Sequence, residues 1–170
     1  MSNQDHYSHW DIFCAVVDNY GDIGVTWRLA KQLANEYGLE IRLWVDDLAS
    51  FAHILPALDA NCPRQSFEGV SIHRWDKPLS STYVPGRVLI EAFACELPNE
   101  VVNTITNEHQ NGNKVPVWLN LEYLSAEDWV EGCHGLPSLQ RSGLKKHFYF
   151  PGFTTKTGVL ICETDRLASR

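Results

Sequence analysis

Short apolar segments alternate with longer amphipathic segments along this chain. Residues 12–17 (IFCAVV) form a continuous apolar run rich in β-branched side chains, which is typical of a strand covered on both faces. Over residues 23–37 the apolar side chains recur every third or fourth position, which predicts a helix packed on a sheet. A second apolar run follows at residues 41–45, so the first part of the chain predicts a strand, a helix and a second strand.

The same alternation continues through the middle of the chain. Residues 70–75 predict a strand whose pattern suits the edge of a sheet, and residues 87–93 and 115–121 predict two further strands. Between these last two, Pro98 opens a predicted helix with an inward apolar stripe. Strands and helices that alternate at crossover spacing predict an α/β domain with a doubly wound, mostly parallel sheet.

The two ends of the chain are more polar than its middle. We interpret residues 1–10 as a polar leader and residues 11–153 as the folded domain. Near the end of that domain, the aromatic run at residues 147–153 predicts either a final strand or an exposed patch that another domain or a partner covers. Residues 154–170 are polar apart from a short apolar run at 159–161, and we interpret them as a tail or as the start of an interdomain linker.

Composition narrows the classes of function. The chain has 170 residues, of which 44% are apolar and 21% charged, as in an ordinary globular domain. Its net charge of −7 argues against a general nucleic-acid or anionic-membrane surface, since both call for a basic patch. The leader lacks the apolar region of a secretory signal, and no apolar stretch approaches the length that spans a bilayer. The five cysteines are scattered and odd in number, which indicates reduced thiols in a cytoplasmic protein.

The first predicted strand is followed by a polar turn, residues 18–24 (DNYGDIG), that carries two acids. In open α/β sheets ligands bind at the carboxyl ends of the strands, and the helix beyond the turn offers free N–H groups to anions. Gly21 and Gly24 would permit a tight, close backbone turn, although they do not form the G-x-G-x-x-G fingerprint. Asp22 and Asp18 could act as a general base and its helper. Alternatively, Asp22 caps the helix and Asp18 is an ordinary turn former.

Polar side chains also follow two other predicted strands. Glu122 and Tyr123 come directly after residues 115–121, and a carboxylate beside an aromatic ring would suit a guanidinium or another cation. Alternatively, Glu122 is a solvated side chain at a strand end. Asp47 follows residues 41–45, where capping of a short helix is the better explanation.

Other chemistries have weaker support. Cys133 and His134 could be a nucleophile and its base, but Gly132 and Gly135 beside them favour a flexible loop. No histidine has the spacing of a metal ligand. A small nucleotide-binding or hydrolase domain is a third class of function, for which the sequence shows neither a P-loop nor a nucleophile elbow.

Four segments together resemble the bacterial protein-arginine rhamnosyltransferases that modify translation elongation factor P, the EarP type. They are residues 18–30 (DNYGDIGVTWRLA), 121–129 (LEYLSAEDW), 133–138 (CHGLPS) and 150–154 (FPGFT). The resemblance extends through essentially all of this chain but covers only the amino-terminal half of the family. It implies a Rossmann-like domain that forms one half of a GT-B glycosyltransferase.

The resemblance also implies a reaction. Rhamnose would pass with inversion from dTDP-β-L-rhamnose to an arginine of translation elongation factor P. In this family the amino-terminal domain chiefly receives the acceptor, while a carboxyl-terminal domain holds most of the nucleotide sugar. No metal or other cofactor is expected, because no DxD-type site is evident. Without the donor-binding half, the chain alone is expected to be inactive, and the alternative function is a non-catalytic module that docks elongation factor P or a similar basic loop.

Roles for individual residues follow from the same resemblance. Asp22 corresponds to the general base that activates the acceptor arginine, and Asp18 corresponds to the second essential acid. Gly21 and Gly24 are assigned to the donor. The residues assigned to acceptor binding are Asn19, Tyr20, Glu122 and Tyr123.

Overall fold

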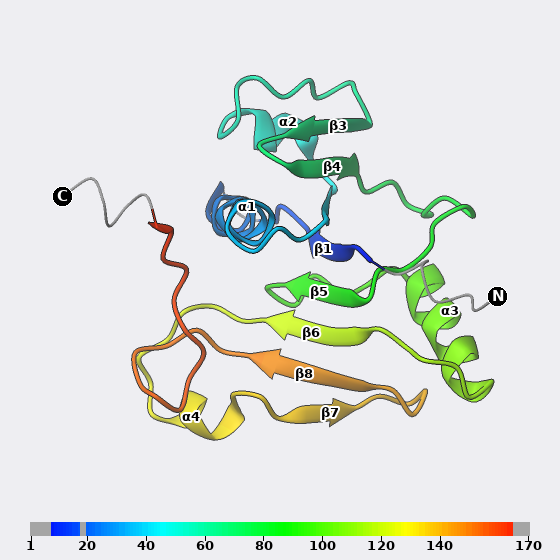
Figure 1. Ribbon diagram of the computed structural model, residues 1–170, viewed down its shortest axis with the longest axis vertical. Helices are drawn as coiled ribbons and strands as arrows, with labels where there is room; N and C mark the ends of the chain where they lie inside the picture. Colours follow the sequence, from blue (N-terminus) through cyan, green and yellow to red (C-terminus); the bar gives the residue numbers. More distant parts are fainter. Residues whose placement is uncertain (1–7, 18–19, 165–170) are drawn as a thin grey trace.

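The computed structural model describes residues 8–17 and 20–164, and its centre is one mixed sheet of eight strands (Figure 1). Neighbouring strands follow the order β3-β4-β2-β1-β5-β6-β8-β7. The strands are β1 (Trp10–Cys14), β2 (Ile41–Val45), β3 (Arg64–Phe67), β4 (Val70–Arg74), β5 (Val88–Ala92), β6 (Val117–Leu121), β7 (Pro137–Leu139) and β8 (Lys145–Tyr149). The helices are α1 (Tyr20–Asn35), α2 (Leu48–Ala52), α3 (Asn99–Gln110) and α4 (Trp129–Cys133).

The sheet is doubly wound about β1. From β1 the chain builds outward through β2 and β4 on one side, then returns to build β5, β6 and β8 on the other, and these six strands are all parallel. Only β3 and β7, at the two edges, run antiparallel to their neighbours. The prediction of a doubly wound, mostly parallel α/β sheet is therefore confirmed. The direction of winding changes between β1 and β5, and the crevice at such a switch point is where ligands bind in open α/β sheets.

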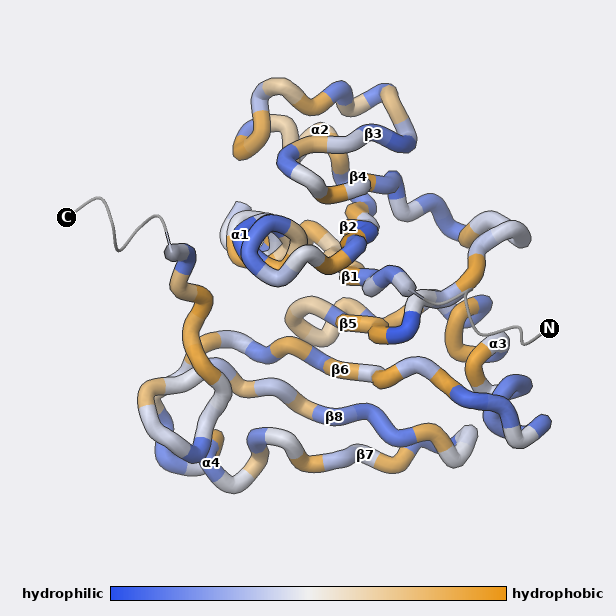
Figure 2. The backbone as a smooth tube through the Cα atoms, in the orientation of Figure 1, coloured by the Kyte–Doolittle hydropathy of each residue, from blue (hydrophilic) through white to orange (hydrophobic). Residues whose placement is uncertain are grey.

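Two apolar cores cover the two faces of the sheet. Alternate side chains of β1 point to opposite faces, so Ile12 packs in the core that contains Trp27 of α1, while Phe13 packs in the core that contains Val101 and Ile105 of α3. The central strand β5 consequently appears as a mostly apolar stretch in Figure 2. Burial of each Ile or Phe side chain stabilises the fold by about 1.5–3 kcal/mol. Because apolar side chains must therefore recur at the buried positions, their spacing in the sequence located these elements.

The strand at 70–75 is not an edge strand, so that prediction is wrong. β4 pairs on its outer side with β3, which was not predicted, through a hairpin whose turn residues Glu68 and Gly69 have φ values of 47° and 80°. The β3 segment is polar and only partly buried, so it carries little hydrophobic signal. Next to the other edge strand, β8 provides a strand within the aromatic region, but it ends at Tyr149 and does not include residues 150–153.

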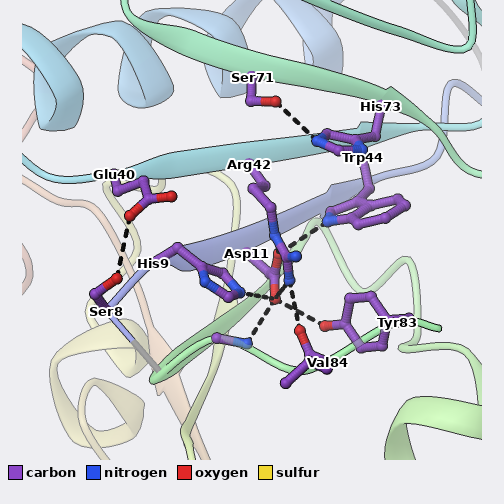
Figure 3. A network of polar contacts seen from close by, with 11 residues as sticks. Ser8, His9, Asp11, Glu40, Arg42, Trp44, Ser71, His73, Tyr83 and Val84 are labelled. Carbon is purple, nitrogen blue, oxygen red and sulfur yellow. Dashed lines mark hydrogen bonds and ion pairs between the residues drawn. The ribbon is translucent and has the colours of Figure 1, made fainter. Parts of the chain in front are cut away.

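A buried acid lies near the amino-terminal end of β1 (Figure 3). Asp11 is fully buried and accepts two hydrogen bonds from Arg42, at 2.7 and 2.8 Å, with further bonds from Trp44, Tyr83 and the amide of Gly86. Burial by itself would raise the pKa of this carboxyl, but the hydrogen bonds of His9 and Arg42 and the charge of Arg42 outweigh burial and lower the pKa to about 2. The network ties β1 and β2 to the loop before β5.

Residues 159–164, which we call the terminal strap, return to α1. Glu163 accepts two hydrogen bonds from Arg28, at 2.7 and 2.8 Å. Gln32 donates to the carbonyl of Cys162 at 2.8 Å, and the amide of Thr164 donates to Glu36 at 2.8 Å. Arg28 and Gln32 of α1 and Glu36, directly after its end, are spaced four apart, so they form one polar stripe that holds the strap. The proposed division at residue 153 stays a prediction. None of the helices in the described part of the chain is long and apolar enough to cross a membrane.

Candidate active site

A groove of about 790 Å³ lies between α1 and the terminal strap, on the face of the sheet that α1 covers. Its floor is apolar and comes from β5 and β6, through Ile90, Leu119 and Leu121. Three polar residues, Asp22, Glu122 and Tyr123, line it near the carboxyl-terminal ends of the strands. The groove therefore brings together the polar segments that follow the first strand and the sixth strand, which are about a hundred residues apart in the sequence.

Asp22 lies in the first turn of α1 and is half-buried. Its Oδ2 accepts a hydrogen bond from the Tyr123 hydroxyl at 3.0 Å, and its carbonyl accepts one from the Thr26 hydroxyl at 2.7 Å. The alternative that Asp22 is the helix cap is wrong, because α1 already begins at Tyr20. An acid in the first helical turn still interacts favourably with the helix dipole, typically by about 0.3–1 kcal/mol.

Tyr123 is held by an aromatic neighbour. Its ring stacks on that of Phe93, with centroids 4.4 Å apart and planes 19° from parallel. Phe93 and Ala94 both have left-handed backbones, with φ values of 55° and 56°, which costs about 1–2 kcal/mol for each residue other than glycine. This strained turn after β5 is what places the Phe93 ring in the groove.

Buried polar groups stabilise the strained turn. The Phe93 amide donates to the carbonyl of Leu121 at 2.7 Å, and the Ala94 amide donates to the side-chain oxygen of Asn120 at 3.1 Å. Farther along, the Leu97 amide donates to Glu91 at 2.9 Å, and Glu91 also pairs with Lys146 at 3.0 Å. Charge-assisted bonds of this kind are about twice as strong as neutral ones, so they offset much of the strain.

Glu122 is oriented by β6 and β8. The side-chain amide of Asn120 donates to Glu122 Oε1, while the Glu122 backbone amide donates to the carbonyl of Tyr149 at 2.8 Å. Asn120 is almost fully buried, with 1% of its surface exposed, so Glu122 has a rigid partner. The alternative of a simply solvated Glu122 does not describe this arrangement, because the carboxylate is half-buried and hydrogen-bonded.

The remaining predicted site residues differ in placement. Asp18 and Asn19 lie outside the described residues. Tyr20 is exposed at the start of α1 and its ring lies 5.2 Å from that of His53. Gly21 lines the groove with open space around it, whereas Gly24 packs beside Ile54. Both glycines lie inside α1, so the predicted tight turn is wrong at these positions, while their assignment to the donor stays a prediction.

The acids after β2 have structural roles. Asp47 caps α2 by accepting bonds from the Ser50 amide at 2.9 Å and the Ser50 hydroxyl at 2.6 Å, which confirms the capping interpretation. Asp46 accepts a hydrogen bond from the Val16 amide at 2.8 Å. This second bond fixes the segment that leads from β1 toward α1, so Asp46 supports the site from a neighbouring strand.

His134 has a structural role too. Its Nδ1 accepts a hydrogen bond from the Phe150 amide at 3.1 Å, and its ring makes an edge contact with Tyr149. A nitrogen engaged in this way is not available to activate Cys133, so the geometry disfavours a Cys–His nucleophile. Within residues 8–17 and 20–164, no group of three His, Cys, Asp or Glu side chains is arranged to hold a metal ion.

Sequence reasoning did not find Phe93. A phenylalanine at the end of a buried strand normally indicates core, and nothing in the sequence signals a left-handed backbone at this residue type. Glu91 and Asn120 were likewise included in predicted strands without a polar role. Chemically, the assembled site presents one carboxylate aligned by a tyrosine, a second carboxylate aligned by an amide, and an aromatic ring pair. Such a set can hold a planar cation and accept a proton from it.

Comparison with known proteins identifies related sequences. A family model described as elongation-factor P (EF-P) rhamnosyltransferase EarP matches residues 10–170. A protein-arginine rhamnosyltransferase of Shewanella oneidensis is 66% identical over the whole chain, and those of Pseudomonas putida and Pseudomonas aeruginosa are 56% and 52% identical over 95% of it. The chain spans 43%, 41% and 42%, respectively, of the length of these three relatives.

Proposed function

Because the chain belongs to the EarP family, we propose that it is the acceptor-binding domain of an inverting protein-arginine rhamnosyltransferase. The acceptor is an arginine of translation elongation factor P, and the donor is dTDP-β-L-rhamnose. The observation that carries the proposal is the meeting of Asp22, Glu122 and Tyr123 at one groove, since these are the residue types that bind and deprotonate a guanidinium.

The chemistry of arginine sets the demands on the site. A guanidinium is protonated at neutral pH and its nitrogen lone pairs are delocalised, so it attacks an anomeric carbon only when a carboxylate orients it and takes a proton. We assign Asp22 as this base. Glu122 and Tyr123 hold the guanidinium by charge and by stacking, and Tyr20 contacts the acceptor protein from the start of α1.

The remaining assignments follow from family membership. Asp18 is proposed as the second acid, and Asn19 as an acceptor contact beside it. Gly21 and Gly24 are proposed to approach the donor, most of which is bound by a second domain of the GT-B pair. The nitrogen displaces the nucleotide in one step from the opposite face, which inverts the anomeric centre. We propose that this reaction needs no metal.

Asp22→Asn in a full-length enzyme that contains this segment tests the proposed base. The variant keeps an acceptor for the Tyr123 hydroxyl but cannot take a proton at neutral pH. We expect the rate of rhamnose transfer to elongation factor P to fall by about a hundredfold or more. Mass spectrometry of the modified arginine measures this rate. Asp76→Asn is a matched control, because Asp76 pairs with Arg74 on the surface and does not line the groove, so its activity should be unchanged. Full activity of Asp22→Asn would contradict the assignment.

The 170-residue chain distinguishes the enzyme half from a docking module. We expect it to bind unmodified elongation factor P, measured by calorimetry, and to transfer no sugar when dTDP-rhamnose is added. If the full-length enzyme also transfers nothing while the chain still binds, the alternative of a non-catalytic module that docks elongation factor P is the correct one. Absence of binding by both proteins would contradict both functions.

A further inference from the structure

Tyr123 and Phe93 connect Asp22 to the rigid part of the sheet. The Tyr123 hydroxyl donates to Asp22 Oδ2 at 3.0 Å, and the Tyr123 ring stacks on Phe93. Asp22 comes from α1, whereas the two aromatic residues follow β6 and β5. The contact therefore joins three elements, and it fixes one oxygen of the carboxylate while leaving Oδ1 outside that bond.

The position of the Phe93 ring is enforced rather than locally preferred. Phe93 has a φ of 55°, which side chains other than glycine rarely adopt. Its amide bonds to Leu121, and the next amide bonds to the buried Asn120. Strained residues persist only where the surroundings determine them, and they cluster where function needs a fixed geometry.

We propose that Tyr123 is a positioning residue for Asp22 and that Phe93 acts through Tyr123. This inference rests on the proposed function, because it requires Asp22 to be the base. It goes beyond the proposed role in acceptor binding, which needs only the Tyr123 ring and for which the hydroxyl would be dispensable.

The physical reason is orientation. A carboxylate that rotates freely presents its lone pair to the substrate proton for only part of the time, whereas a hydrogen bond to one oxygen fixes the plane of the group. Loss of that bond slows the chemical step and leaves the other acceptor contacts in place. The predicted signature is therefore a lower kcat with an almost constant KM for elongation factor P.

Tyr123→Phe in the full-length enzyme removes the hydroxyl and keeps the ring stacked on Phe93. We expect kcat to fall by about tenfold and KM for elongation factor P to change by less than about twofold. Phe93→Leu should lower kcat in the same way, because Tyr123 loses its support. Asp76→Asn is again the control, since Asp76 makes an exposed pair with Arg74 and does not line the groove, and its kinetics should be unchanged.

The double variant Phe93→Leu/Tyr123→Phe distinguishes a shared role of the two residues from a general structural defect. If both residues act through one hydrogen bond, the double variant is no slower than Tyr123→Phe alone. Additive losses would overturn the role of Phe93. A raised KM with unchanged kcat in Tyr123→Phe would overturn the positioning role of Tyr123 and show that its hydroxyl contacts the acceptor instead. If Tyr123→Phe does not fold, Phe93→Leu carries the same comparison of kcat with KM.

Asp22→Asn, measured in the same series, separates the two proposals. If Asp22→Asn is inactive and Tyr123→Phe is fully active, only the positioning role fails. If Asp22→Asn is active, the base assignment itself fails and the positioning role falls with it.

Discussion

At the scale of single residues, the buried carboxylate of Asp11 dominates the amino-terminal edge of the sheet. It is fully buried and is bonded by Arg42, Trp44 and Tyr83 (Figure 3). Asp11→Asn removes the charge and leaves the Arg42 guanidinium, only 19% exposed, without its anion. We expect the free energy of unfolding of the chain, measured in urea at pH 7, to fall by about 3–5 kcal/mol. Asp76→Asn breaks an exposed pair and should cost less than about 1 kcal/mol.

The same residue predicts how this difference depends on pH. The pKa of Asp11 is about 2 in the folded protein, below its ordinary value of 3.8, so the folded state favours the charged form. Its contribution to stability is complete above about pH 4 and is lost as the pH falls through 2. The difference between the wild type and Asp11→Asn should therefore stay constant from pH 7 to 5 and shrink below pH 4. A difference that grows on acidification would contradict this account.

The residues of the candidate site were predictable to different degrees. Asp22, Glu122 and Tyr123 could be selected from the sequence because they follow predicted strands, and ligands bind at that edge. The hydrogen bond between Asp22 and Tyr123 could not be predicted, because it depends on the rotamers of two side chains that are 101 residues apart in the sequence. Phe93 and Asp11 carry no sequence signal, because both lie next to or within strands that look like ordinary core.

At the scale of elements, the turn between β5 and α3 stores strain that a glycine would relieve. Ala94 has a φ of 56° and its side chain is exposed. Burial of the Ala94 methyl group therefore does little to offset the energy of the strained backbone. We expect Ala94→Gly to raise the free energy of unfolding by up to about 1 kcal/mol. Ala92→Gly, two residues earlier in regular β5 and 2% exposed, should lower it by a similar amount. Equal destabilisation by both variants in urea would show that the turn is not strained.

Elements with a periodic apolar face were predictable, and the others were not. Five of the parallel strands, β1, β2, β4, β5 and β6, and the long helices bury regular faces, so hydrophobic spacing located them, whereas β8 has no fully buried residue and was one of two alternatives for its region. The edge strands β3 and β7 are short and only partly buried, and their pairing comes from the hairpin turns beside them. The start of α1 was placed at Ile23 rather than Tyr20, because Gly21 and Gly24 suggested a turn where the backbone is helical.

At the scale of the whole molecule, the covering of the sheet is uneven. α1 and α2 pack over β1, β2 and β4, whereas the β5 and β6 residues on the same face form the floor of the groove. The apolar residues of the strap are visible in Figure 2 as the segment that leads to the C-terminus. Topology could be predicted because crossover connections follow from element order. The strap could not, since residues 154–170 lack a periodic pattern.

The ion pair between Glu163 and Arg28 joins the end of the terminal strap to α1, and it predicts how the strap is coupled to the rest of the molecule. Glu163 is 16% exposed and receives two bonds from Arg28, so this pair is better shielded than an ordinary surface pair. Glu163→Gln removes the charge and keeps the shape. We expect amide hydrogen exchange of residues 161–164 to increase severalfold, while the global free energy of unfolding changes by less than about 1 kcal/mol, because the sheet does not depend on the strap. Lys156→Gln breaks an exposed pair with Glu131 and should leave exchange in the strap unchanged. If Glu163→Gln instead lowers global stability as much as Asp11→Asn does, the strap is part of the cooperative core.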